Sequence, residues 1–242
     1  MITMYTSPSE ISYQNRITEH VFNRFGINPH NTDRVYENTA LIEVNPNFLV
    51  DVLNVFCDYQ EMNNALFQKY SVLVLVDYLK KSHIYYLEKI LPEIGQSISI
   101  LLNNCDKTHP LLTVLYQFYY KYKNELETHF FEEEETLFPY AKRLYRTTYF
   151  KTETYLFINY LQQFSLSDFV ETHSDTIKEL IKIKAILQEY EPSITNKTSF
   201  RVLIEQLNNF EKDLNIHAFI EDEVLMPKLF NLEKNIKFEI QN

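Results

Sequence analysis

Residues 129–139 read His-Phe-Phe-Glu-Glu-Glu-Glu-Thr-Leu-Phe-Pro, and residues 217–227 read His-Ala-Phe-Ile-Glu-Asp-Glu-Val-Leu-Met-Pro. Both stretches share one pattern: a histidine, a glutamate four residues later, and an ending of Leu, then Phe or Met, then Pro. Positions i and i+4 of an α-helix lie nearly above one another, so each histidine and its glutamate project from one helix face. An imidazole and a carboxylate placed in this way supply half of a metal site. The two copies of the pattern therefore predict the two halves of one metal site.

The composition favours a helical protein. The chain has 242 residues, enough to bury a full core, and its two glycines are Gly26 and Gly95. So few glycines argue against phosphate-binding loops, dinucleotide-binding folds and β-rich architectures with many tight turns. The two cysteines, Cys57 and Cys105, are too few for a disulfide framework.

Charge and hydropathy exclude several classes of partner. The formal net charge is −10, which argues against a nucleic-acid partner because the phosphate backbone repels an acidic protein. The longest apolar run, residues 72–76, is too short to cross a bilayer. The N-terminus lacks the charged and apolar stretches of a secretory signal. We therefore expect a cytoplasmic protein that contacts no membrane and no nucleic acid.

Four amphipathic segments follow an N-terminal region. Residues 1–60, which prolines divide into short segments, are expected to be irregular or partly helical. In residues 61–242, apolar side chains recur at helical spacing around four histidines: His83, His129, His173 and His217. Turn-like sequences separate these segments. The sequence thus predicts an all-α fold, an antiparallel up-down four-helix bundle over residues 61–242.

The spacing of the four histidines supports this arrangement. Two residues on the arms of an antiparallel hairpin lie at the same height when they are equally far from its turn. The midpoint between His83 and His129 is residue 106, and the midpoint between His173 and His217 is residue 195; both fall in turn-like sequences. Each arm of about 22 residues rises roughly 33 Å, so a histidine outside this register would lie far from its partner. The chain therefore reads as a duplicated unit.

This register predicts one site built from four helices. Its metal ligands would be four imidazoles and two carboxylates: His83, His129, Glu133, His173, His217 and Glu221. Such a set suits a di-metal centre in which each metal takes two histidines and the two glutamates bridge. Two divalent ions would also neutralise two buried carboxylates, which otherwise cost several kcal/mol each. Imidazole and carboxylate without thiolate favour iron or manganese, with zinc as a competitor.

The other histidines, and Cys105, are not expected to be metal ligands. A single histidine on an apolar helix face is more often a packing residue than a ligand. His109 precedes His129 by 20 residues, which is about 30 Å along one helix. We expect His20 and His30 at the surface or at helix caps. Cys105 is expected to be a half-buried packing residue.

Of the four glutamates at residues 132–135, one is expected to be a metal ligand. Only the i+4 position is occupied by glutamate in both copies and points in the direction of the histidine, which selects Glu133. Glu135 and Glu223 are expected to make solvated or outer contacts. The sequence leaves open which of several tyrosines contacts the ligands: Tyr85, Tyr86, Tyr119 or Tyr122.

These motifs resemble the hemerythrin-like family. Two copies of His-x3-Glu-x2-[Thr/Val]-Leu-[Phe/Met]-Pro, with single histidines on the preceding helices, are most similar to the RIC proteins, di-iron proteins linked to repair of iron–sulfur clusters after nitrosative and oxidative stress. Residues 83–94, His-Ile-Tyr-Tyr-Leu-Glu-Lys-Ile-Leu-Pro-Glu-Ile, resemble the first ligand helix of that family. The resemblance covers roughly residues 65–235. It implies two iron ions with an oxo or hydroxo bridge, terminal histidine ligands and bridging glutamates.

The chain departs from the family pattern in two places. The first histidine of the family precedes Leu-Pro by seven residues, whereas His83 precedes Leu91 by eight. One residue turns a side chain by about 100°, so we expect a local wide turn before Pro92 that keeps His83 facing inward. The N-terminal module of the family carries paired cysteines, whereas residues 1–60 contain Cys57 alone. Oxygen-carrying hemerythrins use five histidines, one more than the set here.

The resemblance implies a role in repairing iron–sulfur clusters or supplying iron under stress from nitric oxide or peroxide. The protein would then be a metal-binding repair or iron-donor protein rather than a classical enzyme. Its expected partners are a diatomic molecule, O2 or NO, at the metal, and iron–sulfur proteins. One alternative is an O2- or NO-binding or sensing protein without net chemistry. A di-iron oxidase or peroxidase is less favoured, because such sites usually carry four carboxylates, and a metal-free helical bundle is the remaining alternative.

Overall fold

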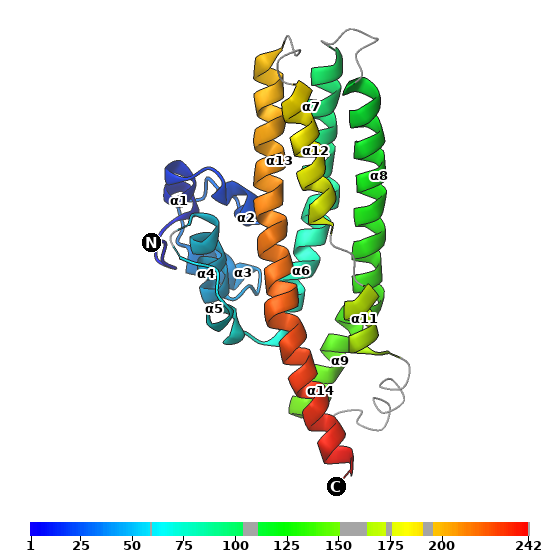
Figure 1. The fold of residues 1–242 in the computed structure, drawn as a ribbon. Coiled ribbons are helices and arrows are strands. Elements are labelled where there is room, and N and C mark those ends of the chain that lie inside the picture. Colours follow the sequence, from blue (N-terminus) through cyan, green and yellow to red (C-terminus); the bar gives the residue numbers. More distant parts are fainter. Residues whose placement is uncertain (59, 104–110, 151–163, 173–175, 191–195, 242) are drawn as a thin grey trace. The chain divides into compact units, whose positions relative to one another are not determined.

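The computed structural model describes residues 1–58, 60–103, 111–150, 164–172, 176–190 and 196–241. All regular secondary structure in these residues is helical (Figure 1), which confirms the predicted all-α class. The up-down order of a four-helix bundle and the domain boundary after residue 60 stay predictions. No helix in the described ranges is long and apolar enough to cross a membrane.

The chain divides into two compact units, each made of segments distant in sequence. Unit 1 comprises Met1–Tyr85, Ala141–Glu153 and Ile216–Asn242, and unit 2 comprises Tyr86–Tyr140 and Thr154–Asn215. The elements that belong to unit 1 are α1 (Pro8–Gln14), α2 (Thr18–Arg24), α3 (Val35–Leu41), α4 (Pro46–Phe56), α5 (Asn64–Gln68), α6 (Val72–Tyr85), most of α9 (Phe138–Phe150), η4 (Phe219–Leu225) and α14 (Met226–Gln241). Those of unit 2 are η1 (Tyr86–Ile90), α7 (Leu91–Asn103), α8 (Leu111–Glu132), η2 (Glu133–Leu137), α11 (Leu166–Thr172), α12 (Ile177–Tyr190) and most of α13 (Lys197–Ala218).

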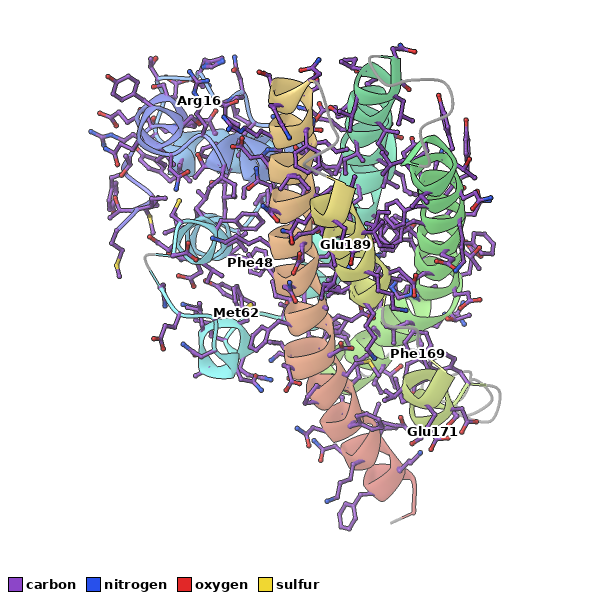
Figure 2. The ribbon with its side chains drawn as sticks, turned by 45° about the horizontal axis from the view of Figure 1, so that its top comes forward. Arg16, Phe48, Met62, Phe169, Glu171 and Glu189 are labelled. Atoms are coloured by element: carbon purple, nitrogen blue, oxygen red, sulfur yellow. The ribbon has the colours of Figure 1, made fainter. Side chains whose placement is uncertain are left out.

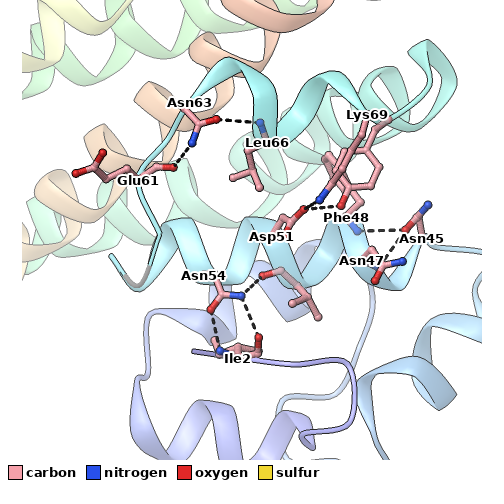
Figure 3. A network of polar contacts seen from close by, with 12 residues as sticks. Ile2, Asn45, Asn47, Phe48, Asp51, Asn54, Glu61, Asn63, Leu66 and Lys69 are labelled. Atoms are coloured by element: carbon pink, nitrogen blue, oxygen red, sulfur yellow. Dashed lines mark hydrogen bonds and ion pairs between the residues drawn. The ribbon is translucent and has the colours of Figure 1, made fainter.

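The short helices of unit 1 begin at residues whose side chains cap them. The Ser7 hydroxyl accepts a hydrogen bond from the N–H of Glu10, and the Glu10 carboxylate accepts one from the N–H of Ser7. Asn45 and Asn63 cap α4 and α5 by accepting from backbone N–H groups of the first turn (Figure 3). Pro46 follows Asn45 at a position where a helix needs no N–H donor. These caps explain why a proline-punctuated region forms helices.

Aromatic side chains pack the short helices against α6. Phe48 of α4, labelled in Figure 2, has its ring centroid 5.0 Å from that of Tyr70 and 5.4 Å from that of Tyr78. The buried Arg24 of α2 lies 5.2 Å from the Tyr78 ring and donates a 2.9 Å hydrogen bond to its hydroxyl. Because α6 carries His83, this aromatic core fixes the helix that supplies the first predicted ligand.

Two sets of hydrogen bonds join distant segments within unit 1. The Asn54 side chain accepts from the N–H of Ile2 at 2.8 Å and donates to its carbonyl at 3.0 Å (Figure 3). The Gln68 side chain of α5 donates to the Val224 carbonyl of η4 at 3.4 Å. The Lys228 ammonium of α14 donates to the Gln68 carbonyl at 2.6 Å, and burial lowers the pKa of Lys228. Helix α5 thus ties the N-terminal helices to the second His-x3-Glu segment.

In unit 2, helices α7, α8, α12 and α13 lie side by side (Figure 1). Tyr119 of α8 reaches the backbone of α7 and donates to the Leu91 carbonyl at 3.2 Å. A Cβ atom on Gly95 would lie 2.6 Å from the Tyr119 hydroxyl oxygen, so the absence of a side chain at Gly95 permits this approach. Lys184 of α12 and Glu211 of α13 form an ion pair between neighbouring helices.

In the described residues, three wide turns, η1, η2 and η4, interrupt the α-helical hydrogen bonding, and each is π-helical. The second residue after each of them is a proline: Pro92, Pro139 and Pro227. A proline inside an α-helix has no N–H, and its ring clashes with the carbonyl four residues earlier. A wide turn relieves this conflict within a continuous helix. In η2 the N–H of Phe138 bonds to the Glu133 carbonyl, five residues back. The predicted wide turn before Pro92 is therefore confirmed as η1.

Candidate metal centre

Unit 1 brings two predicted ligands together from distant parts of the sequence. His83 lies near the end of α6 and His217 near the end of α13, and both side chains are buried. Their Nε2 atoms are 3.3 Å apart, and their ring centroids are 5.0 Å apart with an interplanar angle of 46°. Two imidazole nitrogens directed at each other in a dry interior share either a hydrogen bond or a metal ion.

The separation of these nitrogens fits a metal ion. Two nitrogen atoms about 2.1 Å from an ion, at a tetrahedral angle, are about 3.4 Å apart. The buried Glu221 adds a carboxylate whose Oε2 lies 3.6 Å from Nε2 of His217. Both histidines are candidate metal ligands, and iron, manganese and zinc all accept imidazole and carboxylate donors. A divalent cation would also compensate the buried negative charge. His83 and His217 therefore belong to a possible metal-binding group.

Unit 2 contains the other His-x3-Glu pair. Nε2 of His129 lies 2.8 Å from Oε1 of Glu133; the Glu133 side chain is fully buried and that of His129 is 9% exposed. The ring of Phe130 lies 5.4 Å from the His129 ring and is itself buried. Each copy of the motif thus places its imidazole and its carboxylate together in a dry environment, as i,i+4 spacing on a helix predicts.

The remaining acidic residues of the two motifs differ from Glu133 and Glu221 in burial. Glu132 and Glu135 are exposed, and Glu134 is half-buried. Glu223 in the second copy is also exposed. This pattern agrees with the expectation that Glu135 and Glu223 face solvent. The assignment of Glu133 and Glu221 as ligands stays a prediction.

Three residues weighed in the sequence, His173, Cys105 and His109, lie outside the described residues. His173 as a ligand therefore stays a prediction. His30 is exposed, as expected. His20 was expected at the surface or at a cap, whereas it is half-buried, with Nδ1 2.8 Å from the hydroxyl oxygen of Tyr85. The reason is the packing of α2 against α6, which the irregular sequence of the N-terminal region did not reveal.

A sequence comparison with known proteins gives evidence independent of this geometry. The chain is similar to an iron–sulfur cluster repair protein. That protein, ScdA of Staphylococcus haemolyticus (strain JCSC1435), is 20% identical over 231 residues, which cover 94% of this chain and 99% of ScdA. The likeness therefore includes most of residues 1–60, and it supports a relation to the repair proteins. No family model and no solved structure matches the chain.

The structure also adds one acidic residue that the sequence argument missed. The hydroxyl of Tyr86 donates a 2.5 Å hydrogen bond to Oδ1 of Asp213, and both residues are buried in unit 2. Asp213 precedes His217 by four residues, so the spacing Asp-x3-His-x3-Glu marks it as a member of the ligand-bearing face of α13. That spacing is the sequence signal from which Asp213 could have been identified. Tyr86 was one of four candidate tyrosines that the sequence did not separate.

Proposed function

We propose that this chain is a non-haem di-iron protein that acts in the cytoplasm in the repair of iron–sulfur clusters under nitrosative and oxidative stress. The observation that carries the proposal is the pair of buried His-x3-Glu motifs, one in each unit, together with the imidazole of His83 directed at that of His217. The likeness to ScdA, which is named as an iron–sulfur cluster repair protein, supports the same function.

In this proposal the two motifs contribute to one centre. The proposed ligands are four histidines and two glutamates: His83, His129, His173, His217, Glu133 and Glu221. What supports a single centre is the spacing along the chain, because each pair of histidines is centred on a turn-like sequence. Glu133 and Glu221 would help to hold two ions, whose positive charge would neutralise the two carboxylates.

The residues of the chain would control the centre through burial and charge. Neutral imidazoles add no charge, so the two carboxylates leave two divalent ions with a net positive charge that favours a small electron-rich ligand. Bound iron would supply a change of redox state and open positions for O2 or NO. The buried Phe130 beside His129 limits access of water. Iron–sulfur proteins with damaged clusters are the proposed partners.

A repair assay tests the proposal. An iron–sulfur enzyme inactivated with peroxide or nitric oxide is incubated with the iron-loaded protein, and its recovered activity is measured. The wild type should restore activity faster than an equal amount of ferrous salt, and His217→Ala should not. His30→Ala serves as the matched control, because His30 is an exposed histidine remote from either motif in sequence. Recovery no faster than with ferrous salt would contradict repair and would leave reversible O2 or NO binding as the function.

A further inference from the structure

Tyr86 and Asp213 form a buried hydrogen bond whose purpose the ligand set does not explain. The phenol donates to the carboxylate at 2.5 Å, Tyr86 is fully buried and Asp213 is 3% exposed. Hydrogen bonds from a hydroxyl to a carboxylate are short and strong. Burial of Asp213 is nevertheless costly, and a phenylalanine at position 86 would fill nearly the same volume without requiring it.

Asp213 is peculiar to one half of the duplicated sequence. It lies four residues before His217 on α13. The residue four positions before His129 is Glu125, which is exposed. The symmetric ligand pattern therefore does not account for a carboxylate at Asp213, which accepts a hydrogen bond from the Tyr86 hydroxyl.

Tyr86 also stands in a row of aromatic rings in unit 2 that begins at a predicted ligand. Its ring centroid lies 6.0 Å from that of Phe130, which in turn lies 5.4 Å from the ring of His129. On its other side, the row continues to Phe210 at 5.3 Å, then to Tyr122 at a further 6.4 Å and finally to Phe118 at a further 5.1 Å. Phe118 is half-exposed. We name these rings, from Phe130 to Phe118, the aromatic row.

We propose that Tyr86 is a one-electron donor that reduces radical oxidants formed beside the ligands, with Asp213 as the acceptor of its proton. The inference rests on the proposed function, because it takes His129 as a ligand of redox-active iron. The oxidant that Tyr86 would reduce is a small oxygen radical derived from peroxide. The aromatic row gives the donor a route by which it can be reduced again from the surface.

The chemical step balances with a hydroxyl radical as the oxidant, the species that one-electron reduction of hydrogen peroxide yields together with hydroxide. Tyr86 gives one electron to the radical, which becomes hydroxide, while the phenolic O–H bond breaks and the proton passes to Oδ1 of Asp213. Asp213 then gives this proton to hydroxide, so the net change is the loss of one hydrogen atom from Tyr86 and the formation of one water. A thiol in solution returns one electron and one proton, and two of the resulting thiyl radicals join as a disulfide.

The carboxylate distinguishes Tyr86 from a buried tyrosine such as Tyr78. Removing an electron from a phenol without its proton would leave a positive charge in an apolar interior, which is costly. Asp213 takes up the proton at hydrogen-bond distance and prevents that charge from forming. Tyr78 provides the contrast: it is also fully buried, but its hydroxyl accepts a hydrogen bond from Arg24. A guanidinium cannot accept a proton.

The test compares four proteins: the wild type, Tyr86→Phe, Asp213→Asn and the matched control Tyr78→Phe. Each is loaded with ferrous iron under anaerobic conditions, its iron content and melting temperature are measured, and it is mixed with hydrogen peroxide and frozen for electron paramagnetic resonance. We expect a tyrosyl radical in the wild type and in Tyr78→Phe, and loss of that signal in Tyr86→Phe and Asp213→Asn at unchanged iron content. Asp213→Asn keeps the side-chain size, so a role in packing alone would leave the radical in place.

The outcomes separate this inference from the proposed function. If the wild type binds iron but forms no tyrosyl radical, or if Tyr86→Phe retains the full signal, Tyr86 is not the donor and the iron site stands. If the wild type binds no iron, both the proposed function and this inference fail. If Asp213→Asn melts far below the wild type, Tyr86→Phe, which removes the phenolic hydroxyl and keeps the ring, carries the same two outcomes by itself.

Discussion

His83 and His217 are 134 residues apart in sequence, and their Nε2 atoms lie 3.3 Å apart in the buried interior of unit 1. Each comes from the end of a helix that is followed directly by a wide turn, η1 in one case and η4 in the other. The approach of two imidazole nitrogens is therefore built into the backbone of both helices. In the proposed function, a metal ion would be bound by both nitrogens together with the nearby carboxylate of Glu221.

Chelation of the iron-loaded protein should lower its melting temperature by about 5–10 °C. An ion held at about 100 times its dissociation constant stabilises a fold by about 2.7 kcal/mol, and each kcal/mol shifts the melting temperature of a chain of this size by about 2–4 °C. Circular dichroism with and without chelator measures the shift. His217→Ala should show no shift, since one imidazole of the pair is gone. Superimposable transitions for the wild type would rule out metal bound in the core.

Deletion of Glu88 should leave the direction of His83 unchanged and preserve iron binding. Glu88 lies within η1 and its side chain is exposed. Removing one residue restores seven-residue spacing between His83 and Leu91 and closes the wide turn, so the side chains before and after the turn keep their relative directions. Glu88→Ala, which removes the carboxylate and keeps the length, is the control. Iron content after anaerobic loading measures both variants. Loss of iron from the deletion variant alone would contradict the view that η1 accommodates one extra residue.

Features of the structure that follow from local sequence spacing could be predicted more directly than those that deviate from a regular helix. The i,i+4 relation between His129 and Glu133 is local, and the helical period alone was enough to find it. The inward direction of His83 needed a second argument, because its spacing to Leu91 contradicts a regular helix; the wide turn that reconciles them is η1. The prolines at 139 and 227 carried the same signal for η2 and η4, yet a regular helix was expected there.

Other features depend on long-range packing that no local pattern encodes. Asp213 was missed because an aspartate on a helix is by default a solvated residue, and its burial depends on Tyr86 from a distant part of the chain. The sequence of residues 1–60 predicts an irregular or partly helical region because its helices are short, and contact with α6 by residues such as Phe48 stabilises them. His173 lies outside the described residues, so its role still rests on spacing alone.

Gly95→Ala should destabilise the protein by about 1–3 kcal/mol, although alanine is the better helix former. The new Cβ would meet the Tyr119 hydroxyl oxygen at 2.6 Å and the adjoining ring carbon at 2.7 Å. Urea unfolding of the single and double variants measures the coupling. Tyr119→Ala should recover part of the loss by opening space, and Gln96→Ala, at an exposed site on the same helix, should change little. Strictly additive effects of Gly95→Ala and Tyr119→Ala would contradict the contact.

Tyr70 should make the stability of unit 1 fall at high pH. Burial, and then the hydrogen bond and charge of Asp51, raise the pKa of Tyr70 above its usual value of 10.0. Lys69 forms an ion pair with the same carboxylate at 2.7 Å (Figure 3). Below pH 10 the phenol is neutral in both folded and unfolded chains, so its contribution is complete. Above pH 10 the unfolded chain loses the proton first, so stability decreases as pH rises.

The measurement is urea unfolding of the wild type and Tyr70→Phe at neutral pH and above pH 10. At neutral pH, Tyr70→Phe should be less stable by about 1.5–3 kcal/mol, the net value of a hydrogen bond to a charged group. Above pH 10 the difference between the two should shrink. Tyr13→Phe, at a tyrosine that is 92% exposed, is the control. A difference that stays constant across this range would contradict the raised pKa.

The central claim is that the two buried His-x3-Glu motifs hold iron, and metal analysis of anaerobically purified and iron-loaded protein tests it most directly. The wild type and His30→Ala should contain about two irons per chain, and Glu133→Ala and Glu221→Ala should each lose most of that iron. A wild type that retains less than about half an equivalent of iron after loading, or glutamate variants that keep the full amount, would contradict the account.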